Sequence, residues 1–461
     1  MNNHPALDEL KSLLSLPEDI DVHIDGSEPV LPSRFALSET AASTLAAIGI
    51  SVADIWRTRT RQGQNVSVKI RHAAAALNSF LFNRLDGQPP VTRDRSVPRG
   101  VTGIYPTKDG RFFHTHGSFD PAGMCAAVGC EPDPAKLPAA VANWDALELE
   151  QHLDHEGHCG AMVRSRDEWS AHPHGQALAA KPVVEVIKLG ESDPEAAGRG
   201  DRPLAGLHVL DLTRVLAGPT CGRTLAEHGA EVLRIGAPHL PTLAMFDRDT
   251  GHGKRWAHLN LKDRDDLALM HSLVAGADVF SEGYRPGVMA RLGLSPEELH
   301  AMRPGIVCVS INCYGHEGPF SHRPGWEQLG QSVSGMADEE GGTQSPRLVP
   351  AAACDYTTGY LAALGALTAL RRRESEGGSY LVRVSLARTG MWYVAQPRIP
   401  DDRQLPDTGL ARDDVSDLET DSVVADGRIT HLAPVVQLSH TQPHWQRPAP
   451  GNGADKPVWV T

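Results

Sequence analysis

Apolar stretches of strand length alternate with helical patterns through the middle of the chain. Residues 204–236 form a buried apolar run, a loop, a helical pattern, a glycine stop and a second apolar run. The alternation continues with a helix at 263–275, a strand at 278–280, a helix at 296–302 and a strand at 305–311. Strands separated by helices are typical of parallel sheets. We therefore expect an α/β fold, with a Rossmann-like doubly wound parallel sheet and a second, smaller α+β domain.

The most regular stretch of the chain, residues 351–393, has the pattern of a helix, a turn and a strand. Asp355 is followed by a long segment rich in Ala and Leu, which closes on three arginines at 371–373. A Glu-Gly-Gly turn follows, and residues 381–386 alternate as a strand does. A carboxylate just before an apolar helix is typical of an N-cap. On pattern alone, we expect Asp355 to cap this helix.

The same helix, turn and strand occur once more near the N-terminus, at residues 38–77. Matched positions lie 316 or 317 apart: Glu39 with Asp355, Gly49 with Gly365, Arg57 with Arg373, Val68 with Val384, and Asp109 with Asp426. A constant spacing over several elements indicates internal duplication.

Changes in pattern and composition divide the chain into six segments. A stretch rich in Pro, Gly and charge separates two compact regions, and an acidic stretch precedes the C-terminal end. The expected segments are an N-terminal lead (1–35), a helix-turn-strand repeat copy (36–100), a smaller α+β domain (101–190), a linker (191–203), the Rossmann-like domain (204–398), and an acidic linker with a short C-terminal hairpin (399–461).

Composition narrows the classes of function. The chain has 461 residues, a net charge of −13 and 22% charged residues, which argues against nucleic-acid binding because phosphates need a clustered basic surface. No apolar run approaches the length of a membrane span, and the N-terminal segment carries acids where a signal peptide is basic. Seven cysteines without a C-x-x-C pair suit reduced thiols. We expect a cytoplasmic protein with no nucleic-acid or membrane partner.

Several familiar site patterns are missing from the sequence. The strand-loop-helix at 207–228 lacks G-x-G-x-x-G, and its second strand ends at Gly236 instead of an acid, which disfavours a hydride-transfer cofactor. The loop VLAGPT could still bring its backbone close to a ligand, because Gly218 permits such an approach. The histidines of HLDHEGHC do not have the spacing of common zinc sites, so we expect no metal. No G-x-S-x-G motif is present.

Acidic residues are the remaining candidates for chemistry. A carboxylate at the start of a helix, such as Asp355, is held ionised by the helix dipole and can attack an activated acyl group. A thioester is an acyl group of the right reactivity. Glu327, which lies between a loop and a glycine break, could equally be a solvated residue of a first helical turn.

Residues 204–392 resemble the N-terminal half of the family III CoA-transferases, which include formyl-CoA and carnitine CoA-transferases and the 2-methylacyl-CoA racemases. The resemblance covers about two fifths of the chain in the family's order. It rests on these blocks: LAGLHVLDLTRVLAGP, LAEHGAEVLRI, GKRWAHLNLK, ADVFSEGYRPGVMARLGLSPEEL, RPGIVCVSINCYGHEGP, GWEQLGQSVSG and CDYTTGYLAALGALTALRRRESEGGSYLVRVSL.

The resemblance implies a role for each matching residue. Asp355 is expected to be the nucleophile, acylated in turn by substrate and by CoA. The other expected positions are Val215, Leu216 and Ala217, whose backbone lies along CoA; Tyr284 and Arg291, at its adenosine and phosphate end; and Glu327 and Trp326, near the acyl group.

We therefore expect an enzyme that moves CoA between an acyl-CoA thioester and a carboxylic acid, through an aspartyl anhydride and an aspartyl-CoA thioester on Asp355. No cofactor is expected to stay bound, since CoA is itself a substrate. The family implies an interlocked homodimer. Two alternatives remain: a non-catalytic CoA-binding or assembly subunit, and a racemase. Racemisation is disfavoured because Trp326 stands where the racemases have a histidine, and an indole cannot exchange a proton.

The chain also departs from the family's pattern. Gly236, Ala237 and Gly283 replace residues usual at the adenine end. The smaller domain at 101–190 precedes the sheet half instead of following it, as if the second half of one copy were joined to the first half of another. Glu39 then marks the Asp355 position of the incomplete copy, and we expect it to be inert. Either one chain completes the fold, or two chains complete each other.

Overall fold

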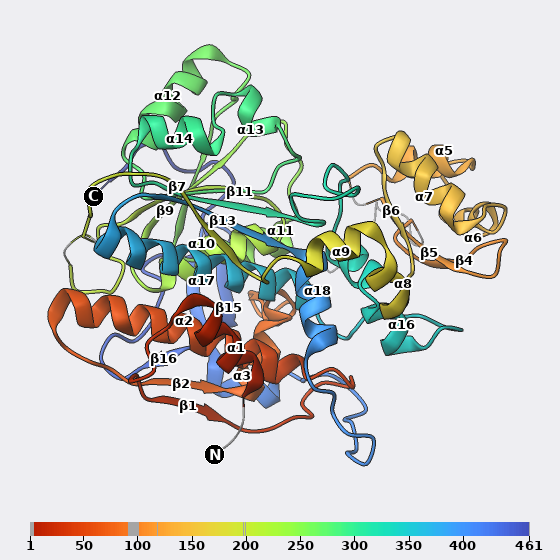
Figure 1. The fold of residues 1–461 in the computed structure, drawn as a ribbon, viewed down its shortest axis with the longest axis horizontal. Coiled ribbons are helices and arrows are strands. Elements are labelled where there is room, and N and C mark those ends of the chain that lie inside the picture. The colour runs from red at the N-terminus through yellow and green to blue at the C-terminus, as the bar shows by residue number, and fades with distance from the viewer. Residues whose placement is uncertain (1–3, 91–100, 118, 197, 199, 461) are drawn as a thin grey trace.

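The computed structural model describes residues 4–90, 101–117, 119–196, 198 and 200–460, and is built around a seven-stranded sheet (Figure 1). The strand order is β10-β9-β8-β11-β12-β13-β7, and all neighbours are parallel except β13 and β7. Its strands are β7 (Glu185–Gly190), β8 (His208–Leu212), β9 (Glu231–Gly236), β10 (Lys254–His258), β11 (Val279–Glu282), β12 (Val307–Asn312) and β13 (Ser379–Ser385). The predicted mixed α/β architecture with a large parallel sheet is confirmed.

Helices cover both faces of this sheet, because successive side chains of each strand point to opposite sides. In β8, Val209 packs into a core shared with α10 (Ala217–Glu227) and α17 (Ala353–Glu376). Its neighbour Leu210 packs into a separate core with α12 (Arg264–Ala275) and α14 (Pro296–Met302). Both α12 and α14 lie where the apolar pattern predicts helices.

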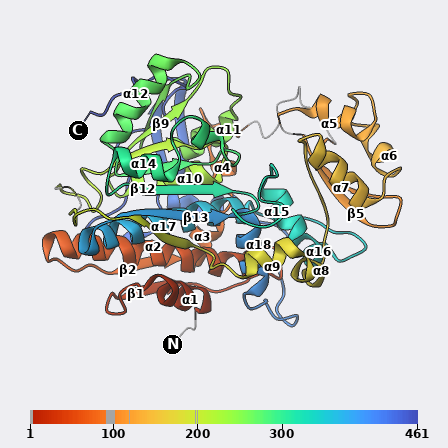
Figure 2. The ribbon, with the colours of Figure 1, turned by 45° about the horizontal axis from the view of Figure 1, so that its top comes forward.

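The duplicated element is present as two long helices, α2 (Leu37–Thr60) and α17, each of 24 residues. They pack against one another beneath the central sheet (Figures 1 and 2). Gly49 and Gly365 occupy matching positions, and a Cβ on either would overlap a valine of the following strand, Val66 or Val382. The close approach of a valine therefore explains why glycine stands at this position in both copies.

A small sheet repeats the edge of the large one. In it, β2 (Val66–Lys69) is parallel to β1 (Val22–Asp25) and antiparallel to β16 (Gln437–Leu438), just as β13 lies between β12 and β7. A third sheet joins the chain ends, since β15 (Gly427–Leu432) pairs with β14 (Glu419–Val424) and with β3 (Arg84–Leu85). The C-terminal hairpin thus completes the N-terminal copy.

The 101–190 unit lies to one side of the molecule, in orange and yellow in Figures 1 and 2. It contains β4 (Gly103–Pro106), β5 (Phe112–His116), β6 (Cys159–Met162), α5 (Pro121–Val128), α6 (Leu137–Val141) and α7 (Ala146–His155), with a core of their own. From β6 the chain passes through α8 (Arg166–Ala171) and α9 (Pro173–Ala179) into β7. The segment division predicted from sequence places β7 in the smaller domain, whereas it pairs at the edge of the large sheet. Local pattern cannot reveal this, because the partner strand is far away in the sequence.

The remaining helices lie in connections. They are α1 (Pro5–Leu14), α3 (Ile70–Ala76), α4 (Ser79–Phe82), α11 (Ala244–Thr250), α13 (Val288–Arg291), α15 (Glu327–Val333), α16 (Met336–Gly341), α18 (Leu386–Ala395) and a 3-10 turn at Asp413–Leu418. Among the described residues, no helix combines the length and the apolar character that crossing a bilayer requires.

Candidate active site

A cavity of about 830 Å³ opens at the carboxyl ends of the central strands. It lies where the strand order reverses, between β8 and β11, and it is lined by the loops that follow β8, β11 and β12. Sheets of this kind bind ligands at such a point, because the loops on either side of it diverge and leave a crevice. The cavity is therefore the candidate active site.

Asp355 lines this cavity with a side chain that is 9% exposed. The expectation that it caps the helix is wrong: Ala352 is the N-cap of α17, and Asp355 is the third helical residue. The capping carboxylate is instead Glu327, at the start of α15, which accepts hydrogen bonds from the backbone N–H groups of Cys354 (3.1 Å) and Asp355. The cap comes from a distant segment, so local sequence could not identify it.

Glu327 and Asp355 form a buried pair of acids. Burial raises the pKa of Asp355 well above its ordinary value, and the negative charge of Glu327 raises it further. Burial also raises the pKa of Glu327, to about 7, against the opposing effect of hydrogen bonds from Gln331 and from the start of α17. Near neutral pH the two carboxylates therefore compete for a proton, and the helix dipole alone does not keep Asp355 ionised.

The loop after β8 carries backbone strain. Val215 has a φ of 69°, a left-handed conformation that a β-branched residue rarely adopts, and such strain concentrates at functional sites. Leu216 is the N-cap of α10 and Ala217 its first residue, and all three residues line the cavity. A Cβ on Gly359 would overlap the Ala217 carbonyl oxygen, so the loop is packed directly against α17. The predicted CoA loop and the predicted nucleophile are thereby brought together.

Of the other predicted residues, some line the cavity and others lie outside it. Trp326 and Tyr284 line the cavity, whereas Arg291 is exposed at the end of α13 and Glu327 lies behind the wall, 5% exposed. Three arginines that the sequence did not single out also line the cavity: Arg214, Arg285 and, beside Trp326, Arg323. The first two can be recognised from the pattern. Both lie in the loops that follow β8 and β11, so a search for cations at strand ends would have found them.

Residues of the 101–190 unit complete the wall. The ring of His116 stacks on Trp326 at 4.7 Å between ring centroids, and Phe119 lies 5.2 Å from the same indole. Burial lowers the pKa of His116 to about 3, so this imidazole is neutral and a weak base. Sequence analysis missed these residues because they reach the cavity only through the docking of separate segments.

The histidine-rich stretch 152–159 does not form a metal site within the described residues, where no group of three or more potential ligands gathers. His152 Nε2 lies 2.9 Å from the Ala127 carbonyl oxygen, and its ring stacks on Trp144. That histidine therefore serves the small core of the 101–190 unit.

Comparison with known proteins shows which family the chain belongs to. The model of CoA-transferase family III matches residues 20–200 and 204–415. The acetyl-coenzyme A transferase nodX of Hypoxylon pulicicidum is 32% identical over 444 residues, which cover 85% of this chain and 73% of that protein. An acyl-CoA transferase of Gibberella moniliformis is 30% identical over 406 residues, 79% of this chain and 71% of that protein.

More partial similarity extends to other proteins. The alpha subunit of the succinyl-CoA–L-malate CoA-transferase of Chloroflexus aurantiacus is 32% identical over 46% of this chain and 52% of its own length. The crystal structure of Rv3272 from M. tuberculosis superposes with a TM-score of 0.40 at 30% identity, over 43% of this chain and 59% of that one. From the extent of the family match and of the first two relatives, this chain belongs to CoA-transferase family III.

Proposed function

We propose that this enzyme moves CoA from an acyl-CoA thioester to a carboxylic acid through covalent intermediates on Asp355. The observation that carries the proposal is the position of Asp355, whose carboxylate lines the strand-end cavity directly beside the loop of Val215 and Ala217. The strand order, which reverses between β8 and β11, supports a Rossmann-like, doubly wound arrangement of the 204–398 domain.

The proposed reaction needs one nucleophile and no permanently bound cofactor. Asp355 attacks the thioester carbonyl and the C–S bond breaks. This releases CoA as a thiolate and leaves the acyl group on Asp355 as a mixed anhydride. The thiolate attacks the aspartyl carbonyl, which releases the donor carboxylate and forms an aspartyl-CoA thioester. The acceptor carboxylate then attacks that thioester, giving a new anhydride and free thiolate. Attack of the thiolate on the acceptor's acyl carbon yields the new acyl-CoA and restores Asp355.

The surrounding groups have separate roles in this proposal. Backbone N–H groups at the start of α10, next to Val215, would stabilise the oxyanions that form at each attack. Arg214 and Arg285 would meet the negative phosphates of CoA, and Tyr284 would pack on its adenosine. Arg291, one turn beyond the cavity-lining Val288, would meet the part of CoA that extends outward.

We propose an uncharged, apolar acyl group as the substrate class. The aromatic wall of His116, Phe119 and Trp326 offers apolar surface. Arg323, the cation that lines the cavity from the same loop as Trp326, is engaged by Glu150 and Asp154. Transfer is favoured over racemisation, because the indole of Trp326 and the weakly basic His116 are poor proton carriers at a substrate carbon.

The proposal is tested by incubating the enzyme with a panel of acyl-CoA thioesters and mapping adducts by peptide mass spectrometry. We expect a hydroxylamine-sensitive adduct on Asp355 and transfer to a carboxylic acid. Asp355→Asn should lose both and still bind CoA in calorimetry. Full activity in Asp355→Asn, or an adduct on another residue, would contradict the mechanism. Binding without turnover across the panel would favour a non-catalytic CoA-binding subunit. A homodimer remains our expectation from the family resemblance.

A further inference from the structure

The incomplete copy retains a counterpart of the Asp355 site, at Glu39. Glu39 is the third residue of α2, as Asp355 is the third residue of α17. The carboxylate of Glu28 accepts hydrogen bonds from the backbone N–H groups of Ser38 (2.7 Å) and Glu39 (2.9 Å), as Glu327 does at the other helix. The duplication therefore extends to a capping carboxylate that the repeat spacing did not reveal.

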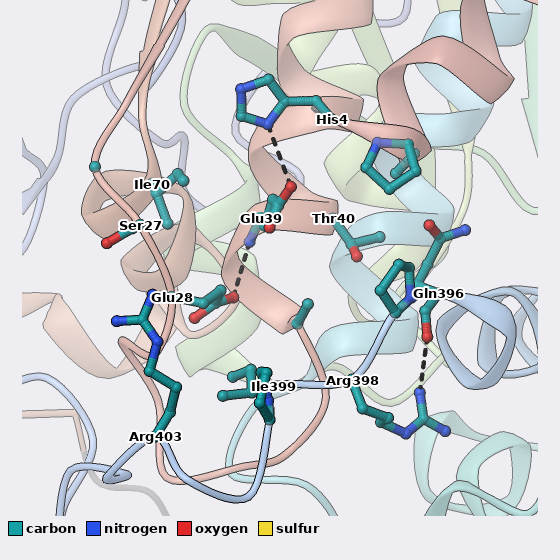
Figure 3. Close-up of a pocket in the computed structure, with 16 residues that line it drawn as sticks. His4, Ser27, Glu28, Glu39, Thr40, Ile70, Gln396, Arg398, Ile399 and Arg403 are labelled. Carbon is teal, nitrogen blue, oxygen red and sulfur yellow. Dashed lines mark hydrogen bonds and ion pairs between the residues drawn. The ribbon is translucent and has the colours of Figure 1, made fainter. Parts of the chain in front are cut away.

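At this counterpart, the acid contacts the N-terminal segment of the chain. Figure 3 shows Glu39 facing His4 from the N-terminal segment, with the segment that carries Ile399 and Arg403 closing the opposite side. Glu39 Oε1 lies 3.3 Å from Nδ1 of His4, and the cavity around them has about 430 Å³. The strand before α2, β1, lies at the edge of a three-stranded sheet, and among the described residues none forms a counterpart of the β8–α10 loop that lines the Asp355 cavity. Within the part of the chain that the structure describes, Glu39 therefore has no strand-end loop beside it that would hold CoA.

At the Asp355 site, the 101–190 unit is held tightly to the 204–398 domain. Inside the 101–190 unit, Arg164 holds Glu150 by a bidentate ion pair at 2.7 and 2.6 Å, with side chains 3% and 1% exposed, and the Arg164 backbone N–H donates across the boundary to the Ser332 carbonyl oxygen at 3.0 Å. Arg323 of the large domain reaches Glu150 at 3.5 Å and Asp154 at 3.0 Å. His114 Nδ1 lies 2.8 Å from Ser332 Oγ, across the same interface.

The connection between the two parts is short and built into the large sheet. After β6, His174 Nε2 lies 2.6 Å from the Tyr314 carbonyl oxygen, and β7 then pairs with β13. The same stretch of chain that supplies Cys159 to the cavity is therefore anchored on the domain that supplies Asp355.

We propose that each chain contains one complete catalytic centre, assembled in cis from its 101–190 unit and its 204–398 domain, and that the Glu39 position carries no reaction. Under this proposal, which rests on the proposed function of Asp355, the N-terminal copy takes the place that a second subunit would fill. Association of two chains is then unnecessary for catalysis.

Complementation between two inactive variants tests the proposal. Asp355→Asn removes the nucleophile, and Cys159→Trp fills the cavity from the 101–190 unit; each is checked for folding by circular dichroism. The two are co-expressed with different tags and co-purified, or mixed after purification. We expect no activity above that of the separate variants. If the site were shared between chains, each mixed dimer would hold one intact and one doubly defective site and would recover about half of wild-type activity, and that recovery would overturn the proposal.

Adduct stoichiometry supplies the second readout. With the wild-type enzyme we expect one hydroxylamine-sensitive adduct per chain on Asp355 and none on Glu39. Glu39→Gln should leave adduct yield and turnover unchanged, whereas an adduct on Glu39 would contradict the assignment. Absence of any adduct in the wild type would refute the proposed function instead, so the two failures are distinguishable.

Discussion

Asp355 and Glu327 are two acids buried side by side, and their roles differ because of what each one touches. Glu327 is satisfied by backbone N–H groups and by Gln331, so it stabilises the helix start. Asp355 lines the cavity and has its pKa raised by burial and by its neighbour's charge. A poorly solvated carboxylate is a stronger nucleophile once it is ionised.

This pair predicts the pH dependence of the first chemical step. Because the pKa of Asp355 is raised, its reactive ionised form appears only as pH rises through that elevated value. The rate of Asp355 acylation in single turnovers should therefore increase with pH above the ordinary range of an aspartate. Glu327→Gln removes the neighbouring charge, which lowers the pKa of Asp355 and should shift the midpoint to lower pH.

The control is Glu28→Gln, which changes the equivalent cap of α2 and should leave the midpoint in place. Quenched-flow measurement of adduct formation over a pH series provides the comparison. An unchanged midpoint in Glu327→Gln would show that the two acids are not coupled.

At the scale of elements, α17 joins Asp355, the proposed nucleophile, to the loop that we propose binds CoA. Gly359, one turn after Asp355, lies against the Ala217 carbonyl oxygen and Thr220 of α10. Gly365, further along the same helix, lies against Val382 of β13 instead. One helix therefore has two close contacts, one beside the cavity and one remote from it.

Because of this difference, alanine substitutions at the two glycines should lower stability alike, whereas only the one beside the cavity should weaken ligand binding. Gly359→Ala should destabilise the fold by about 1–3 kcal/mol through overpacking, and should raise KM for acyl-CoA because α10 and its strained loop must move. Gly365→Ala should cost a similar amount and leave KM unchanged. Thermal unfolding and steady-state kinetics measure both effects. Equal KM values in the two variants would argue against a ligand-binding role for the loop.

At the scale of the whole molecule, the cavity exists because two compact regions are docked. The Arg323 contacts to Glu150 and Asp154 cross this interface, and the Arg323 side chain is only 11% exposed. Removing one partner of an ion pair that is largely withdrawn from water is costly, because the remaining charge stays poorly solvated.

Removing the bridging arginine should therefore loosen the site. Arg323→Met leaves Asp154 with only the exposed His322 as a partner and should weaken docking by about 1–3 kcal/mol, seen as faster hydrogen exchange in β5 and β6 and slower acylation of Asp355. Arg111→Met breaks the exposed pair with Glu168 inside the 101–190 unit and should change neither. Equal exchange in both variants would assign the docking to other contacts.

The strand-helix alternation of 204–311, the repeated helix and the identity of Asp355 as a candidate were all accessible from the sequence. Each depends on residues close together in the chain: periodicity, glycine stops and a block of motif residues. The expectation that Asp355 caps its own helix was wrong because the true cap comes from a remote part of the chain. Its capping partner Glu327 is 28 positions away, and nothing local distinguishes it from a solvated glutamate.

By itself, the sequence determined most of the strand-helix alternation of 204–311, the parallel character of the sheet and the duplication, since local side-chain periodicity and constant spacing encode them. Only the tertiary structure decided that Glu327 caps α17, that β7 belongs to the large sheet, and that His116 and Phe119 face Trp326. These features arise from contacts between remote segments, whose energies depend on burial and on the pairing of charges in three dimensions. The candidate active site is assembled from such remote segments and belongs to that second class.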